Sequence, residues 1–81
     1  MAHFAELDPA TMRVTRVIVV SNQITYDQQG QEHEELGIAF CRQLYGAQTE
    51  WAQTSYNGSF RGKYAGIGDL FDPTQNIFIA A

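Results

Sequence analysis

The chain has very little cysteine, few basic residues and no long apolar run. Cys41 is its single cysteine, so no intrachain disulfide can form, and no zinc-type spacing of Cys and His occurs. A lone thiol is compatible with a reducing compartment. No apolar run approaches the roughly 18 residues that span a bilayer. The first residues also lack a basic region followed by an apolar core, so neither a membrane segment nor a secretory signal is expected.

The charge balance is acidic. Five Lys and Arg residues stand against nine Asp and Glu residues, which gives a formal net charge of −4. General nucleic-acid binders usually carry a basic face, so this balance argues against nucleic acid as a partner. Arg61 and Lys63 form a basic spot that is too small to change this conclusion.

The length of 81 residues and the hydrophobic content of 44% predict one folded domain over residues 1–81. A core of this size rarely contributes more than about 3–5 kcal/mol, and small scaffolds often recruit partners. We therefore expect self-association or docking on a larger assembly.

The first part of the chain predicts a β-hairpin. His3–Leu7 alternates weakly with a period of two, and Asp8–Thr11 has the Asp-Pro chemistry of a type I turn. Val14–Val20 is a β-branched run, which is typical of a strand covered on both faces. We interpret this second strand as the central strand of the sheet.

The segment Gln31–Tyr45 has helical periodicity and is the one helix that we expect. Leu36, Phe40 and Leu44 recur every four residues and predict the buried stripe. Gly46 is placed to end the helix in a left-handed conformation. Gly37 is unfavourable inside a helix but would allow a close approach to the sheet. The apolar stripe is widened by Ala39, Cys41 and Tyr45.

The remaining strands complete an α+β prediction. Thr49–Tyr56 alternates like a strand, while Ile67–Asp72 and Ile77–Ala80 predict a second hairpin joined by an Asp-Pro turn. The expected architecture is a hairpin, one helix, and a three-strand antiparallel meander packed on that helix. A right-handed crossover would alternatively bring the strand of Trp51 parallel to the central strand.

The stretch Thr54–Asp72 contains four of the seven glycines and four aromatic residues. It does not form a phosphate-binding loop, because only three residues separate Gly58 from Gly62-Lys63 and Tyr64 replaces the hydroxyl residue. The glycines are better explained by turns, bulges or close backbone contacts.

The candidate interaction residues lie in this stretch. Asn57 and Gly58 form a favoured type I′ hairpin pair. The neighbouring aromatic side chains could pack inward as core or form an amphipathic contact patch, since Tyr and Arg are enriched at interface hot spots. Both alternatives remain open, and Tyr64 inward with Phe60 outward would combine them. The candidate set is Tyr56, Asn57, Phe60, Arg61 and Tyr64.

No catalytic or metal-binding pattern emerges, so the sequence predicts a non-enzymatic protein without a cofactor. His33 precedes Cys41 by eight positions on the expected helix, about 12 Å along its axis, which excludes a direct pair. Cys41 is interpreted as a small core residue. A solvated helix start that complements the helix dipole is the expected role of Glu32, Glu34 and Glu35. The polar segment Ser21–Gly30 is expected to be a solvated loop, because the residues around Asp27 lack the alternating ligands of a calcium loop.

Three segments carry a family resemblance: RVIVVSN, ELGIAFC and QTSYNGSFRGKYAGIGDLFD. Together they resemble a small family of uncharacterised proteins from tailed phages of marine bacteria and cyanobacteria, and the similarity runs from Phe4 to Ile79. Relatives often continue into a further extension, so the chain could be truncated at its C-terminus. Leu70-Phe71 departs from the tyrosine that relatives carry there.

The resemblance implies a virion-associated protein with no assigned catalytic residues. We expect a phage structural or assembly protein that contacts itself or other phage structural proteins. The alternative is a small phage-encoded regulator that binds a host protein. The implied location is the virion or the cytoplasm of the infected host.

Overall fold

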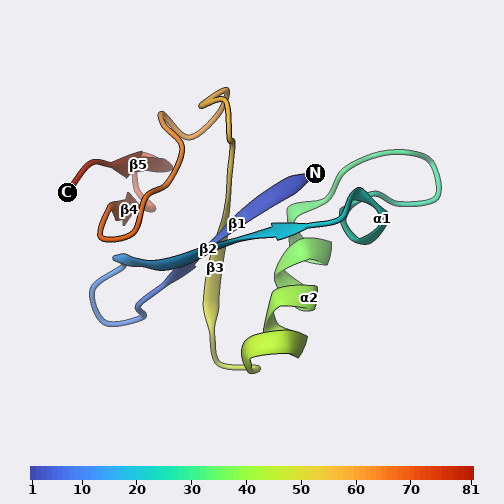
Figure 1. Cartoon of the computed structure of the whole chain (residues 1–81), viewed down its shortest axis with the longest axis horizontal. Helices are drawn as coiled ribbons and strands as arrows, with labels where there is room; N and C mark the ends of the chain where they lie inside the picture. The colour runs from blue at the N-terminus through green and yellow to red at the C-terminus, as the bar shows by residue number, and fades with distance from the viewer.

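A three-stranded antiparallel sheet forms the middle of the molecule, in a computed structural model that describes residues 1–81. Its strands are β1 (Ala2–Leu7), β2 (Val14–Val20) and β3 (Glu50–Thr54), in the order β2-β1-β3. They cross one another in projection in Figure 1, as expected for a twisted sheet. The prediction that Val14–Val20 is the central strand was wrong, because β1 pairs with a strand on each side.

The turn between β1 and β2 follows the predicted chemistry. The Asp8 carboxylate accepts a hydrogen bond from the Ala10 amide at 2.8 Å, and the Asp8 carbonyl accepts one from the Thr11 amide at 3.2 Å. The Asp-Pro pair therefore fixes the first hairpin, as expected.

The sheet separates two small cores. Helix α2 (Glu34–Tyr45) covers one face, and the hairpin of β4 (Leu70–Asp72) and β5 (Ile77–Ile79) covers the other (Figure 1). The core on the helix side consists of Ala2, Phe4, Val20, Cys41 and Trp51. The core on the hairpin side consists of Ala5, Leu7, Val14, Ala52, Ala65, Phe71 and Phe78. Because both faces are covered, four of the six residues of β1 are apolar, and only His3 and Glu6 are polar.

A β-bulge lets β2 contribute to both cores. Glu6 pairs with Arg16, but the next residue, Leu7, pairs with Val14, so Thr15 is the extra residue. The bulge changes the face to which Val14 belongs: Val14 packs on the hairpin side, whereas Val20 packs on the helix side.

Helix α2 approaches the sheet most closely at Gly37. A Cβ atom built there would lie 2.1 Å from Cζ of Phe4, so no larger residue fits without movement. The predicted close approach is confirmed. The predicted stripe is shifted, however, because the small residues Gly37 and Cys41 are the buried ones, while Leu36 and Leu44 are 39% and 59% exposed.

The bounds of the helical segments also differ from expectation. Helix α2 begins at Glu34 rather than Gln31, and the short helix α1 (Asn22–Thr25) lies where a loop was predicted. Gly46 ends α2 as predicted, with its N–H bonded to the Arg42 carbonyl. Its φ of 125° and ψ of 145° are not left-handed helical angles.

The α+β fold class is confirmed, but the three-strand meander is not formed. β3 pairs with β1, while β4 and β5 make a separate two-stranded sheet. β3 also does not pair with β2, so the parallel alternative is wrong as well. None of the helices is long and apolar enough to cross a membrane.

Candidate functional site

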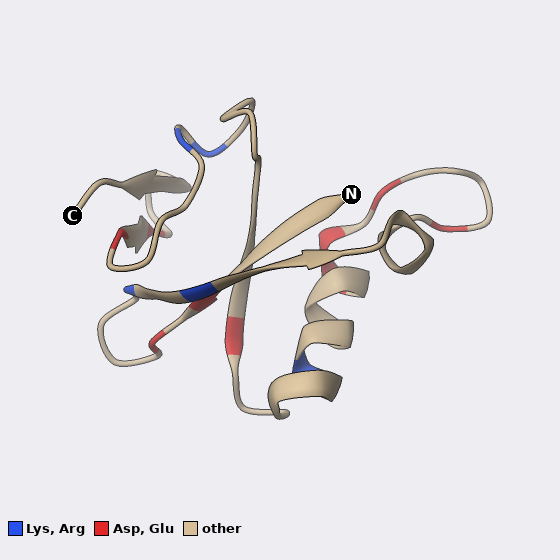
Figure 2. Cartoon of the chain, in the orientation of Figure 1, with Lys and Arg blue, Asp and Glu red and all other residues tan.

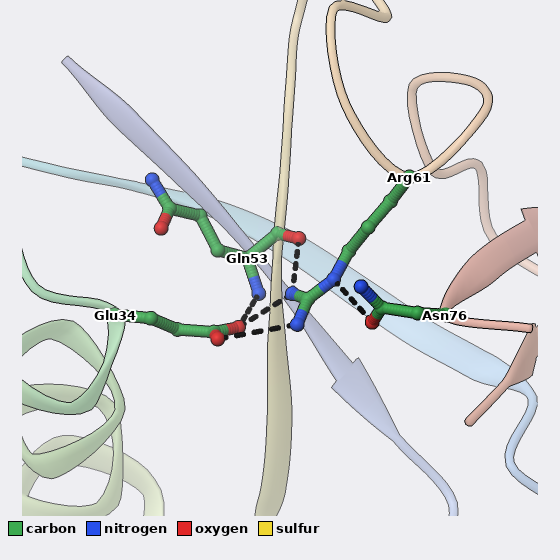
Figure 3. Close-up of polar contacts among 4 residues, drawn as sticks. All are labelled: Glu34, Gln53, Arg61 and Asn76. Carbon is green, nitrogen blue, oxygen red and sulfur yellow. Dashed lines mark hydrogen bonds and ion pairs between the residues drawn. The ribbon is translucent and has the colours of Figure 1, made fainter. Parts of the chain in front are cut away.

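Arg61 is the residue of the glycine-rich stretch that makes the most polar contacts. Its Nη1 and Nη2 atoms lie 2.5 Å and 3.2 Å from the Glu34 carboxylate oxygens, and Nη1 also donates to the Gln53 carbonyl at 2.8 Å. Glu34 in turn accepts a hydrogen bond from the Gln53 amide at 2.8 Å (Figure 3). The ion pair therefore satisfies both main-chain groups of Gln53 on the outer side of β3, where a neighbouring strand would otherwise bond.

The same arginine is also tied to the second hairpin. Its Nε donates to the Asn76 side chain at 3.0 Å, and its carbonyl accepts from the Phe78 amide at 3.0 Å. Its side chain is only 17% exposed. The structure thus places this predicted interaction residue in a structural role, joining α2, β3 and the β4–β5 hairpin. Glu34, expected to be part of a solvated helix start, is its partner.

Lys63 is likewise bound internally, so the basic spot expected from Arg61 and Lys63 is neutralised. Asp69 is buried and accepts hydrogen bonds from Lys63 and from the Gly66 and Ala81 amides. Burial alone would raise the pKa of Asp69, but these hydrogen bonds, led by that of Lys63, hold it below its ordinary value.

Tyr56 and Tyr64 are brought together with His3, a contact that no local sequence pattern predicted. The ring of His3 stacks on the ring of Tyr56, with their centroids 5.5 Å apart, and contacts the Tyr64 ring edge-on, with their centroids 5.6 Å apart. The two tyrosine rings are 5.2 Å apart. Tyr56 is 68% exposed, whereas Tyr64 is half-buried. The pairing of β1 with β3 creates this cluster, because it sets His3 opposite Thr54.

Asn57 lies on an exposed turn rather than in a hairpin. The Gly58 amide donates to the Ser55 carbonyl at 3.0 Å, and Gly58 has a φ of 67°. A type I′ turn needs a positive φ at both central residues, and Asn57 does not have one. The type I′ prediction was therefore wrong, and no strand follows the turn.

Phe60 lies between two adjoining hollows and is 41% exposed. The hollows measure about 220 and 390 Å³ and share Glu32, Gln53 and Phe60 in their lining. We name this surface the Phe60 groove. Tyr26 and Tyr56 line its first hollow, and Glu34 and Arg61 line its second. The groove thus joins aromatic surface to an acidic loop.

Glu32 differs from the other carboxylates of the chain. Six Asp and Glu residues form ion pairs, with His33, Arg16, Arg42, Arg61 or Lys63. Asp8 and Asp72 accept turn amides instead. The only side-chain contact of the Glu32 carboxylate is a long one, 3.5 Å from the Thr25 hydroxyl. Sequence reasoning assigned Glu32 to a solvated helix start and missed its place in the groove.

The titratable groups outside the groove are arranged for stability. Burial raises the pKa of the Cys41 thiol to about 11, and Cys41 is fully buried, as predicted. His33 Nε2 lies 2.7 Å from the Asp27 carboxylate, which also accepts from the Gln29 and Gln31 amides. The loop of Asp27, predicted to be solvated, is therefore held by a local network. No group of three His, Cys, Asp or Glu residues is arranged to hold a metal ion.

Comparison with known proteins gave no match: no protein-family model, no curated protein and no solved structure is significantly similar to the chain.

Proposed function

We propose that this chain is a non-enzymatic structural or assembly protein of a tailed phage, and that it binds other protein surfaces through the Phe60 groove. The observation that carries the proposal is the exposed aromatic ring of Phe60 beside Glu32, a carboxylate with no cationic partner. Exposed aromatic side chains around a polar hollow are typical of protein contact surfaces. The phage assignment comes from the resemblance of the sequence segments.

The chemistry of the groove favours a basic side chain on the partner. Glu32 can pair with an Arg or Lys, and the faces of Phe60 and Tyr56 can accept a cation within about 6 Å. Figure 2 shows further acidic residues along the loop between α1 and α2 and at the start of α2. Since Asp27, Glu34 and Glu35 of this region are already in ion pairs, Glu32 is the carboxylate available to a basic partner segment.

The distribution of basic residues supports a protein partner over nucleic acid. Arg16, Arg42, Arg61 and Lys63 are in ion pairs, and Arg13 donates to the Gly68 carbonyl at 3.1 Å. Phosphate binding would have to compete with these internal contacts. The buried, protonated thiol of Cys41 similarly supports a non-enzymatic role.

Two experiments test the proposal. Mass spectrometry of purified phage particles should detect the chain in the virion or in an assembly intermediate. In a complementation assay, Phe60→Ala and Glu32→Gln should reduce incorporation, whereas Ile67→Ala, which changes another exposed apolar residue of the same stretch, should not. Absence of the chain from particles and intermediates would contradict the structural role.

The alternative is a regulator that uses the same groove to bind a host protein. It predicts a specific complex with one host protein, detected by affinity purification from infected cells and weakened by Phe60→Ala. Such a complex, together with absence from particles, would select the regulator over the structural protein.

A further inference from the structure

The outer edge of β2 is protected over only part of its length. At its first residue, the Val14 amide donates to the Asp69 carbonyl and the Val14 carbonyl accepts from the Gly68 amide, both at 2.8 Å. The bulge at Thr15 follows. From Arg16 to Val20 no other segment of the chain pairs with this edge. The outer edge of β3, by contrast, is closed at Gln53 by Glu34 and Arg61.

The direction of the free main-chain groups follows from the pairing. Both groups of Gln53 point away from β1, so Phe4, its partner residue, must direct its own groups toward β2. Phe4 pairs with Ile18, so Ile18 bonds inward. The neighbouring residues Val17 and Val19 therefore present their N–H and C=O groups outward. Val19 is 52% exposed, and Arg16–Val20 contains no proline or lysine that would block pairing.

We propose that a second copy of this chain pairs with the free edge of β2. The two β2 strands run antiparallel about a two-fold axis at Ile18 and form a six-stranded sheet. Val17 then lies opposite Val19 of the second copy, and Ile18 lies opposite Ile18.

The occupant is a second copy because the surface is complementary to itself under this rotation. The two outward-bonding residues exchange hydrogen bonds with each other. No acidic residue lies within Arg16–Val20, although the chain has nine acidic residues. Arg16 already pairs with Glu6 and would face Val20. Two acidic chains can therefore meet here without opposing like charges.

The dimer is independent of the Phe60 groove, which lies on the β3 side.

Light scattering after size-exclusion chromatography tests the dimer. The purified chain should show twice its mass of 9.1 kDa and dissociate on dilution. Val19→Lys should raise the dimer Kd by about 10-fold or more, because the lysine would replace an apolar contact with Val17 of the second copy. Ile67→Lys, at an apolar residue that is 76% exposed elsewhere, should leave the Kd unchanged. Circular dichroism establishes that all the variants remain folded.

Disulfide trapping tests the register separately. Ile18→Cys should form an intermolecular disulfide on oxidation, because a residue on the axis meets itself at a Cα distance of about 4.5 Å. Val19→Cys should cross-link much more slowly, since its partner is Val17. A monomer at every concentration, a dimer insensitive to Val19→Lys, or cross-linking that favours Val19 would each overturn the proposal. These readouts do not depend on the Phe60 groove, whose variants change partner binding alone.

Discussion

Arg61 and Glu34 form a two-point ion pair across 27 positions of sequence, and this pair lies on the outer edge of β3. It bonds both main-chain groups of Gln53 and so occupies the place of a fourth strand. Since the β4–β5 hairpin is attached to the same arginine through Asn76, the pair couples the two sheets to the helix.

Replacing Arg61 with Met should destabilise the protein by about 1–3 kcal/mol, because it leaves the half-buried Glu34 carboxylate and the Gln53 carbonyl without their donor. Urea unfolding followed by circular dichroism measures the change. Arg16→Met is the matched control: the Arg16 side chain is half exposed and pairs with a single carboxylate, Glu6, so its loss should cost less than about 1 kcal/mol. If both variants lose the same free energy of unfolding, the contact at the β3 edge contributes no more than an ordinary surface ion pair.

Gly37→Ala should also destabilise the protein, by about 1–3 kcal/mol, because the new Cβ would overlap the Phe4 ring. Helix propensity alone predicts the opposite sign, a gain of up to about 1 kcal/mol. Equilibrium unfolding decides between them. Adding Phe4→Leu should reduce the penalty of Gly37→Ala, since the shorter side chain vacates the Cζ position. A stabilised single variant would contradict the close approach.

The Asp27–His33 pair predicts a pH dependence of stability. The hydrogen bond from Asp27 raises the pKa of His33 above 6.5 in the folded protein. The contribution of protonated His33 to the free energy of unfolding is therefore fully present below pH 6.5 and is lost as pH rises through the folded pKa. The Gln31 amide and then His33 lower the pKa of Asp27 below 3.8. That contribution is present above pH 3.8 and is lost as pH falls through the folded value. The pair therefore stabilises most between pH 3.8 and 6.5.

NMR titration of the His33 ring checks this assignment. Its pKa should lie above 6.5 and should fall toward that value in Asp27→Asn. The difference in urea midpoint between the wild type and His33→Gln should be larger at the middle of that pH window than well above the folded pKa of His33. A His33 pKa below 6.5 would refute the pair.

The Cys41 thiol should not react with a disulfide reagent at mildly alkaline pH in the native state, because it is buried and its pKa is about 11. It should react fully in denaturant. Ala39→Cys, at an exposed position of the same helix, provides the control and should react rapidly. Fast labelling of Cys41 in the folded wild type would contradict the burial.

Local patterns predicted the elements better than their arrangement. The β-branched run Val14–Val20 and the Asp-Pro turn at Asp8 were identified because their signals lie within a few residues. The partner of β3 was missed, since nothing in Glu50–Thr54 distinguishes pairing with β1 from pairing with β4. The buried stripe of α2 was misplaced because a hydrophobicity pattern selects large apolar residues. The helix is in fact closest to the sheet at Gly37, where the absence of a side chain allows the approach.

In the candidate site, too, local features were predicted and contacts between distant segments were not. The glycine-rich stretch was identified from its composition, and Phe60 and Tyr56 are indeed exposed. The role of Arg61 could not be predicted, since its partners Glu34, Gln53 and Asn76 come from three separate segments. Glu32 and His3 were missed for the same reason.

The position of β1 also has a consequence for biosynthesis. This strand is made first, yet its second neighbour is β3, and the cover of one of its faces includes Phe78. During translation both apolar faces of the β1–β2 hairpin would therefore remain exposed to solvent until the later segments are synthesised. We expect the chain to fold only after its C-terminal segments have been synthesised. The incomplete nascent chain is then the form that most needs a chaperone.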